Sequence, residues 1–274
     1  MTEIIKSLKY IDLSSITIIG TSINFFFSII MAIILAISLI ISTGSADISI
    51  IILLLAMVFM VLIFSIPDYF GRAYLFNFLI SKLKEINIEI IDMEKITNIS
   101  VFSSAIVCSI ISLIVTTIIF PGILVVGSLL SLILQFLAPD LFYLVLFVSS
   151  PSTIAFSFIF TFISVAIAAS VFNLISPKIG GLRLNLTQEG NMTVINSINY
   201  LNLALILAVI SAVMGLILCL FVSVYLSISL MVVLSLIIYL VLGGFVGGFI
   251  IGALMATFYN FLAPRMGELK VELV

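Results

Sequence analysis

Few residues of this 274-residue chain could take part in catalysis. The sequence has no His, and only 8% of its residues are charged, whereas 64% are apolar. Without His, the common proton relays, imidazole metal sites and Ser-His or Cys-His nucleophile pairs are unavailable. Cys108 and Cys219 lie in apolar runs at no recognisable spacing, which favours small apolar side chains over a metal or redox pair. We therefore expect no enzyme, catalytic residue, metal site or cofactor.

Asp68 and Arg72 are the ionisable residues nearest to the middle of an apolar segment. Their spacing places them on one face of a helix, where they can form an ion pair. Charges at depth in a membrane are costly and are functional candidates. However, Pro67 can end the apolar part of the segment and leave the pair among the lipid headgroups. We favour an anchoring or packing role and keep a functional site as the alternative.

An Asn-containing motif occurs three times. The stretches LFNFLISKLKEINIEI, VFNLISPKIGGLRLNL and FYNFLAPRMGELKVEL align without a gap. Each has an aromatic residue before the Asn, a small residue four positions before it and a basic residue five positions after it. The Asn and basic positions are Asn77, Lys82, Asn173, Lys178, Asn260 and Arg265. Agreement at all these positions predicts an internal repeat.

The three Asn side chains have two interpretations. They could line a central site as symmetry-related polar groups. Alternatively, each could end a helix at the headgroup level, where Asn tolerates capping geometry and Lys or Arg reaches the interface. We favour the second interpretation, because polar residues are inexpensive at the water boundary.

The elements that carry these residues must lie mostly in lipid. Mean hydropathy is +1.51, and soluble domains average roughly 45–50% apolar and about 25% charged residues. A membrane-spanning helix needs roughly 20 apolar residues. Six segments meet that length: about 16–41, 48–66 continuing toward 79, 98–120, 153–174, 196–225 and 229–258. We expect one all-α membrane domain over 1–274, with a minor β component.

The charged residues predict an orientation. All ten Lys and Arg residues lie before the first span, at the ends of even-numbered spans or in the segments between spans 2 and 3, between 4 and 5, and after 6. The loops on the other side carry only Asp47 and Asp140. Because Lys and Arg are retained on the cytoplasmic side, we expect a multi-pass cell-membrane protein with both termini cytoplasmic.

Period-two alternation follows each basic residue of the motif. The alternating apolar residues are Ile86, Ile88 and Ile90, then Leu182, Leu184 and Leu186, then Leu269, Val271 and Leu273. This pattern predicts short cytoplasmic strands, two of them led by a helix-stopping Pro177 or Pro264, and 6–12 resembles them. An isolated two-stranded ribbon is marginal, so we expect several strands to join in one small sheet.

Each repeat is expected to be a helical hairpin that an N-cap opens and the Asn motif closes. Asp12, Asp92 and Asn191 are the predicted N-caps. The repeats then cover about 6–90, 91–186 and 187–274. The second is longer, with an insertion at 121–151 on the outer side, whose apolar pieces 123–137 and 141–149 we expect to be interfacial or re-entrant.

Glycines in the last span predict close helix packing. Gly244, Gly248 and Gly252 recur at four-residue spacing in GGFVGGFIIG. Small residues in one stripe let helix backbones approach closely in lipid. We expect this helix to pack centrally or against another subunit.

The opening IDLSSI and the closing FYNFLAPRMGELKVEL, which follows a Gly-rich span, resemble small two-helix membrane-hairpin proteins of archaea and actinobacteria. This chain resembles three such hairpins in tandem. Repeat one departs most, with Ser81 in place of Pro and Lys84-Glu85 in place of the glycine pair. The resemblance implies a fold unit and brings no activity.

Two functions remain open. The first is a non-enzymatic membrane scaffold or complex subunit, whose exposed cytoplasmic strand edges pair with other copies or other membrane proteins. The second is a transporter or channel for a neutral or lipidic substrate, along an axis between the hairpins. Membrane lipids are expected partners in both cases, and nucleic acid is not.

Overall fold

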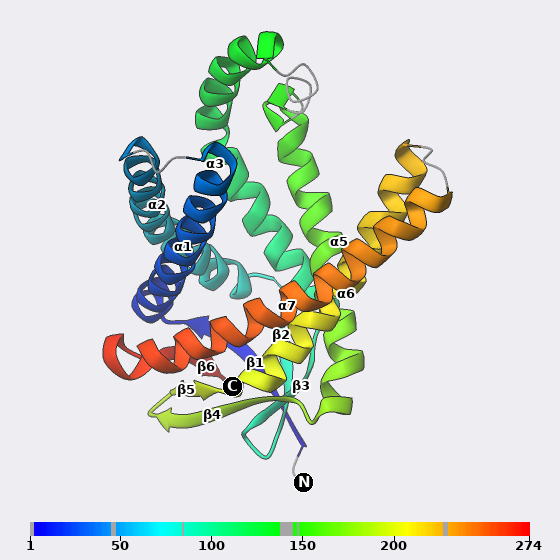
Figure 1. Cartoon of the computed structure of the whole chain (residues 1–274). Coiled ribbons are helices and arrows are strands. Elements are labelled where there is room, and N and C mark those ends of the chain that lie inside the picture. Colours follow the sequence, from blue (N-terminus) through cyan, green and yellow to red (C-terminus); the bar gives the residue numbers. More distant parts are fainter. Residues whose placement is uncertain (1–2, 45–47, 84, 138–144, 147, 227–229) are drawn as a thin grey trace.

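The computed structural model describes residues 3–44, 48–83, 85–137, 145–146, 148–226 and 230–274. Lys84, Asp47 and Asp140 of the charge pattern lie outside these residues. The elements in chain order (Figure 1) are β1 (Glu3–Ile11), α1 (Leu13–Thr43), α2 (Ile48–Ile80), β2 (Ile86–Ile91), β3 (Lys95–Ile99), α3 (Val101–Leu137), α5 (Ser152–Ile175), the 3-10 turn η1 (Ser176–Ile179), β4 (Leu182–Glu189), β5 (Met192–Ile198), α6 (Tyr200–Leu226), α7 (Leu230–Met266) and β6 (Leu269–Leu273).

Among the described residues, six helices are long and apolar enough to cross a membrane, as the hydropathy pattern predicted. Their candidate spans are Leu13–Ser42, Ile50–Ile80, Val101–Leu129, Ser152–Ile179, Tyr200–Ser223 and Met231–Met266. The most apolar 18-residue stretch of each helix has a mean hydropathy of 2.3 to 3.0. Most residues of each stretch are not buried by other parts of the protein. Apolar side chains exposed over this length need lipid or another apolar surface to cover them.

The first helix shows how local sequence sets the bounds. The carboxylate of Asp12 accepts the backbone N–H of Ser15 (2.7 Å), which satisfies one free donor of the first turn. At the other end, Gly44 adopts φ 68° and its N–H bonds to the Ile40 carbonyl. Glycine tolerates this left-handed conformation without a Cβ clash.

The helices pack most closely as three sequential pairs: α1 with α2, α3 with α5, and α6 with α7. Contacts between pairs are sparser and join α2 to α3, α5 to α6 and α7 to α1. Figure 1 shows the pairs diverging from the strands, with their far tips well apart.

The six strands form one small closed barrel in the order β1-β2-β3-β4-β5-β6, and every neighbouring pair is antiparallel. The N-terminal strand closes the barrel by pairing with the C-terminal strand, with Ile11 opposite Val271. Ile86, Ile90, Leu184 and Val194 are buried along the strands, as expected of apolar residues that alternate in a pleated sheet.

Barrel closure limits the expected exposed strand edges to short segments. Each of the six described strands has a hydrogen-bonded neighbour on both sides. Closure removes most unpaired edges, but residues 3–5 of β1 and 185–189 of β4 have a paired strand on one side only.

Two strands, β3 and β5, were not predicted, and they displace two predicted N-caps. Asp92 and Met93 adopt φ 52° and 55° in the turn between β2 and β3, and Asn191 lies in the turn between β4 and β5. The helices that follow begin at Val101 and Tyr200. Asp and Asn favour both N-caps and turns, and here the turn is what forms.

Two findings concern prolines near helix ends. Segment 123–137 is the C-terminal part of α3, which continues through Pro121 to Leu137, and its interfacial or re-entrant placement stays a prediction. Much of 141–149 lies outside the described residues. Pro264 does not stop its helix, which runs on to Met266, whereas Pro177 lies in the first turn of η1, where a missing N–H costs nothing.

Candidate functional site

Each Asn of the repeated motif joins the end of a helix pair to the strand that opens it. Asn77 on α2 accepts the N–H of Ile11 at 2.8 Å and donates to the carbonyl of Ile11 at 2.8 Å. Asn173 on α5 makes the same two bonds to Ile99, at 2.9 and 2.8 Å. Asn260 on α7 makes them to Ile198, both at 2.8 Å.

The chemistry explains why this position needs an amide. Ile11, Ile99 and Ile198 are the last residues of β1, β3 and β5, where a peptide N–H and C=O would otherwise lack partners beside an apolar helix. An Asn side chain offers one acceptor and one donor, as a neighbouring strand would. A carboxylate offers only acceptors. Each Asn thus continues the sheet hydrogen bonding for one more residue.

The backbone around these junctions matches as well. In each case the residue after the bonded Ile donates its N–H to a backbone carbonyl, at 2.9 to 3.0 Å. These bonds run from Asp12 to Lys270, from Ser100 to Asn87 and from Asn199 to Arg183. These three acceptors each lie ten positions after an Asn of the motif. Likewise Leu8 pairs with Ile86, Ile96 with Leu182 and Ile195 with Leu269.

Neither interpretation of the Asn residues describes these contacts. The amide groups bond to backbone instead of presenting polar atoms to a central site, and they reach across to a strand instead of capping their own helices. The basic residues come closer to the interfacial interpretation. The Lys82 ammonium lies 4.2 Å from the centre of the Phe78 ring, and the Arg265 guanidinium 4.0 Å from that of Phe261. Lys178 lies in the last turn of η1.

One hydroxyl distinguishes the third junction. Tyr259 on α7 donates to the Ile195 carbonyl of β5 and accepts the N–H of Leu269 on β6 at 3.2 Å. The equivalent residues, Phe76 and Phe172, are buried without a hydroxyl. The motif contained this Tyr as its aromatic position, but the pattern gave no sign that its hydroxyl bridges two strands.

The glycine stripe of α7 packs against α6, its own hairpin partner. A Cβ on Gly244 would lie 2.8 Å from the Ser211 carbonyl oxygen, and one on Gly248 would lie 2.6 Å from that of Leu207. At Gly252 it would lie 2.7 Å from the Cα of Ala204. By contrast, a Cβ on the neighbouring Gly247 would meet nothing within 4 Å.

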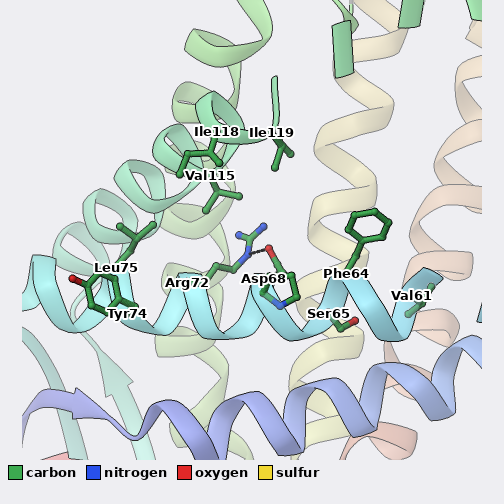
Figure 2. A pocket seen from close by; sticks show the side chains of 12 residues that line it. Val61, Phe64, Ser65, Asp68, Arg72, Tyr74, Leu75, Val115, Ile118 and Ile119 are labelled. Carbon is green, nitrogen blue, oxygen red and sulfur yellow. Dashed lines mark hydrogen bonds and ion pairs between the residues drawn. The ribbon is translucent and has the colours of Figure 1, made fainter. Parts of the chain in front are cut away.

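Asp68 and Arg72 form an ion pair on α2, with Nε of Arg72 donating to Oδ1 of Asp68 at 2.7 Å. Figure 2 shows the pair facing α3 across a cavity of about 730 Å³. Apart from the two charged residues and Ser65, the walls are Val61, Phe64, Pro67, Gly71, Tyr74 and Leu75 of α2 and Val115, Ile118 and Ile119 of α3. The pair therefore lies in a largely apolar groove between two hairpins.

Ion pairs also cross the barrel surface. Lys9 on β1 pairs with Glu85, and this bond together with one from Ser7 lowers the pKa of the Glu85 carboxyl. Lys270 on β6 pairs with Glu189 on β4 at 2.8 Å, which raises the pKa of Lys270. All four side chains are well exposed, so each pair contributes little to stability.

Within the described part of the chain, no group of three or more His, Cys, Asp or Glu residues could hold a metal ion. Cys108 and Cys219 are both free thiols. Comparison with protein-family models, curated proteins and solved structures finds no match to this chain. The resemblance to two-helix membrane-hairpin proteins therefore stays a prediction.

Proposed function

We propose that this chain is a non-enzymatic integral membrane scaffold or a subunit of a membrane complex, built from three repeats of a strand, a helical hairpin and a strand. The observation that carries the proposal is the threefold recurrence of the Asn junction on one closed barrel. A closed barrel with three such junctions holds three helical hairpins in fixed positions, from which they diverge.

The repeat is supported by equivalent contacts as well as by the aligned sequence motif. Equivalent residues of the repeats at about 6–90, 91–186 and 187–274 make equivalent hydrogen bonds, both to backbone and through Asn. The pairing of β6 with β1 takes the place of the covalent turns that join β2 to β3 and β4 to β5. A ring of three repeats, opened at the termini, accounts for these contacts and implies pseudo-threefold symmetry.

The partner surface follows from the helices. The diverging hairpins expose large apolar side chains, among them Ile163 on α5 and Tyr239 on α7, which is 76% exposed. Since few strand residues of the barrel lack a neighbour, the faces between hairpins are the main place for a second copy or another membrane protein. Lipid covers whatever a partner does not.

The expected orientation, with the barrel in the cytoplasm, rests on the positions of the Lys and Arg residues. β1 and β6 are neighbours, so both termini lie at the barrel end. Lys6, Lys9, Lys95, Arg183 and Lys270 lie on strands of the barrel, which suits its placement on the cytoplasmic side of the cell membrane. Gly44→Cys places a thiol at the far tip of the first hairpin, and its labelling from outside intact cells tests this placement.

Stoichiometry in the native membrane tests the scaffold. Extraction of the full chain into polymer-bounded lipid discs, without detergent, preserves its neighbours. The expected result is a particle whose mass and composition contain several 29.8 kDa chains, or this chain and another membrane protein in a fixed ratio. Discs that hold one chain and lipid alone contradict the proposal.

The alternative function is transport of a neutral or lipidic substrate. It is favoured by a second, apolar cavity of about 560 Å³ that shares Phe64 and Ile119 with the first. This cavity continues along α3 to Gly127 and is also lined by Val145 and Val148, which follow α3 in the chain. Reconstituted liposomes with a fluorescent lipid in both leaflets separate the two functions. Rapid loss of outer and inner fluorescence to a membrane-impermeant quencher supports transport, whereas loss of the outer half alone supports the scaffold.

A further inference from the structure

The groove between α2 and α3 has two chemically different halves. The half nearer to the barrel contains the Asp68–Arg72 pair, beside Tyr74 and Leu75, and the half away from the barrel has apolar walls such as Val61 and Ile118. Arg72 lies five residues before Asn77, about 8 Å along the helix from the strand junction. The charged half therefore lies near the lipid headgroups and the apolar half lies deeper.

The length of the groove corresponds to one lipid leaflet. From Arg72 to Val61, α2 rises about 16 Å at about 1.5 Å per residue. Half of a hydrocarbon core of about 30 Å is about 15 Å. An acyl chain that begins at Arg72 would therefore run along the apolar walls to about the bilayer midplane.

The ion pair leaves part of the guanidinium available. Arg72 binds Asp68 through Nε, and neither of its Nη atoms has a hydrogen-bond partner among the described residues. Figure 2 shows the guanidinium inside the groove, on the side of α3 that carries Val115. Two adjacent N–H donors in a plane fit two oxygens of a phosphate. Asp68 holds the side chain in the orientation that presents these donors.

We propose that this groove binds one phospholipid of the barrel-side leaflet, with its phosphate on the Nη atoms of Arg72 and one acyl chain between α2 and α3. The proposal goes beyond the scaffold function and holds with or without a protein partner. A bilayer phospholipid is the occupant because the groove combines a phosphate-binding group, an apolar wall and the length of one leaflet.

The other repeats lack this arrangement. The positions aligned with Asp68 and Arg72 are Ser164 and Ala168, then Ile251 and Met255. None of them carries a charge, so a phosphate has no equivalent cation at those positions. We therefore expect one tightly held phospholipid per chain and not three.

Two variants test the charge and the cavity of the groove separately. Arg72→Gln removes the phosphate donors. Gly71→Leu fills the cavity and keeps both charges, and a Cβ at Gly71 would meet nothing within 4 Å, so the helix accepts it. Arg265→Gln removes a charge of the same kind outside the groove, and Gly247→Leu adds the same side chain where a Cβ also meets nothing within 4 Å. Thermal unfolding of all four variants verifies that they fold.

The purified full chain is reconstituted in vesicles of equal parts phosphatidylglycerol and a diacylglycerol glucoside, and the lipids retained per chain are counted by native mass spectrometry. We expect the native chain to retain one phosphatidylglycerol, preferred about tenfold over the glucoside, as one charge-assisted contact allows. Arg72→Gln should abolish the preference, and Gly71→Leu should abolish retention of either lipid.

The two control variants should behave like the native chain. The proposal is overturned if the native chain shows no preference, if Arg72→Gln keeps it, or if Arg265→Gln loses it equally. Unchanged retention in Gly71→Leu also overturns it, and this variant decides the matter alone if Arg72→Gln fails to fold.

Discussion

At the barrel, each helix pair is fixed by an Asn that makes the same two hydrogen bonds in all three places, whereas along the helices each pair is held in a different way. Between α1 and α2, Asn24 bonds to Ser65 and Tyr69. Between α3 and α5, Thr161 donates to Ser112 at 3.0 Å. Between α6 and α7, glycines bring the backbones together.

The difference shows where the fold demands specific residues. Closing a barrel requires matching register at every junction, because a slip of one residue turns every side chain to the other face. Two helices in lipid need only close packing and a few polar contacts, which many residue combinations provide. This difference accounts for a sequence pattern that recurs at the three junctions, while the residues that join the helices of each pair differ.

The largest expected effect is the loss of a junction. Asn77→Leu, Asn173→Leu and Asn260→Leu each leave one N–H and one C=O without a partner, at an expected cost of about 3 kcal/mol. Unfolding of the purified chain in mixed micelles measures the loss. Three equal losses in the free energy of unfolding would support the equivalence of the three junctions. A near-zero loss at one junction would contradict it.

Asn98→Leu is the matched control for this series. Asn98 is on β3 and is exposed, so the same replacement there should change the free energy of unfolding by less than about 0.5 kcal/mol. A loss at Asn98 as large as those at the junctions would mean that added apolar bulk, not the missing amide, is responsible.

The next effect concerns the helices. Gly248→Leu forces α6 and α7 apart, because its Cβ would lie 2.6 Å from both the Leu207 carbonyl oxygen and Oγ of Ser211. Overpacking of this kind costs about 2 kcal/mol. Gly247→Leu adds the same bulk one residue earlier, where no atom lies within 4 Å, and should cost nothing. Equal unfolding midpoints for the two variants would contradict the packing found between α6 and α7.

Sequence periodicity predicted much of this architecture, and its failures have a physical cause. Alternation identified β2, β4 and β6, since charged or polar residues separate their apolar ones. β3 and β5 lie directly before apolar helices, and their patterns KITNI and MTVINSI merged with the spans that follow. The ends of these two strands were therefore assigned to the membrane-spanning helices that follow them.

The repeated motif marks the positions of the Asn residues, but the sequence does not reveal what they bind. The motif singles out Asn77, yet its partner Ile11 lies 66 positions earlier in the chain. The residues that close the barrel are even farther apart in the sequence, because Ile11 pairs with Val271. Periodicity reports which face of an element is apolar and carries no information about which distant element meets it.

The third effect tests how far one junction differs from the others. Tyr259→Phe converts the third junction to the residue type of Phe76 and Phe172, and it removes the hydroxyl that links β5 and β6. We expect a loss of about 1 kcal/mol in the free energy of unfolding. Tyr239→Phe, at an exposed position, should have no effect. If Tyr259→Phe is also neutral, the hydroxyl adds nothing to the junction and the three are energetically alike.

The smallest effect is a pH dependence at the barrel surface. Bonds from Lys9 and Ser7 lower the pKa of Glu85 in the folded chain. A carboxyl with a depressed pKa stabilises the fold above its unfolded pKa, and this contribution is lost as the pH falls below about 4.5 and through the folded value. Glu85→Gln should therefore narrow the gap between unfolding midpoints measured at pH 7 and at low pH.

Glu94→Gln is the control, because Glu94 is also exposed but lies in the turn between β2 and β3. An unchanged gap in Glu85→Gln would show that the pair with Lys9 does not hold β1 to the segment before β2.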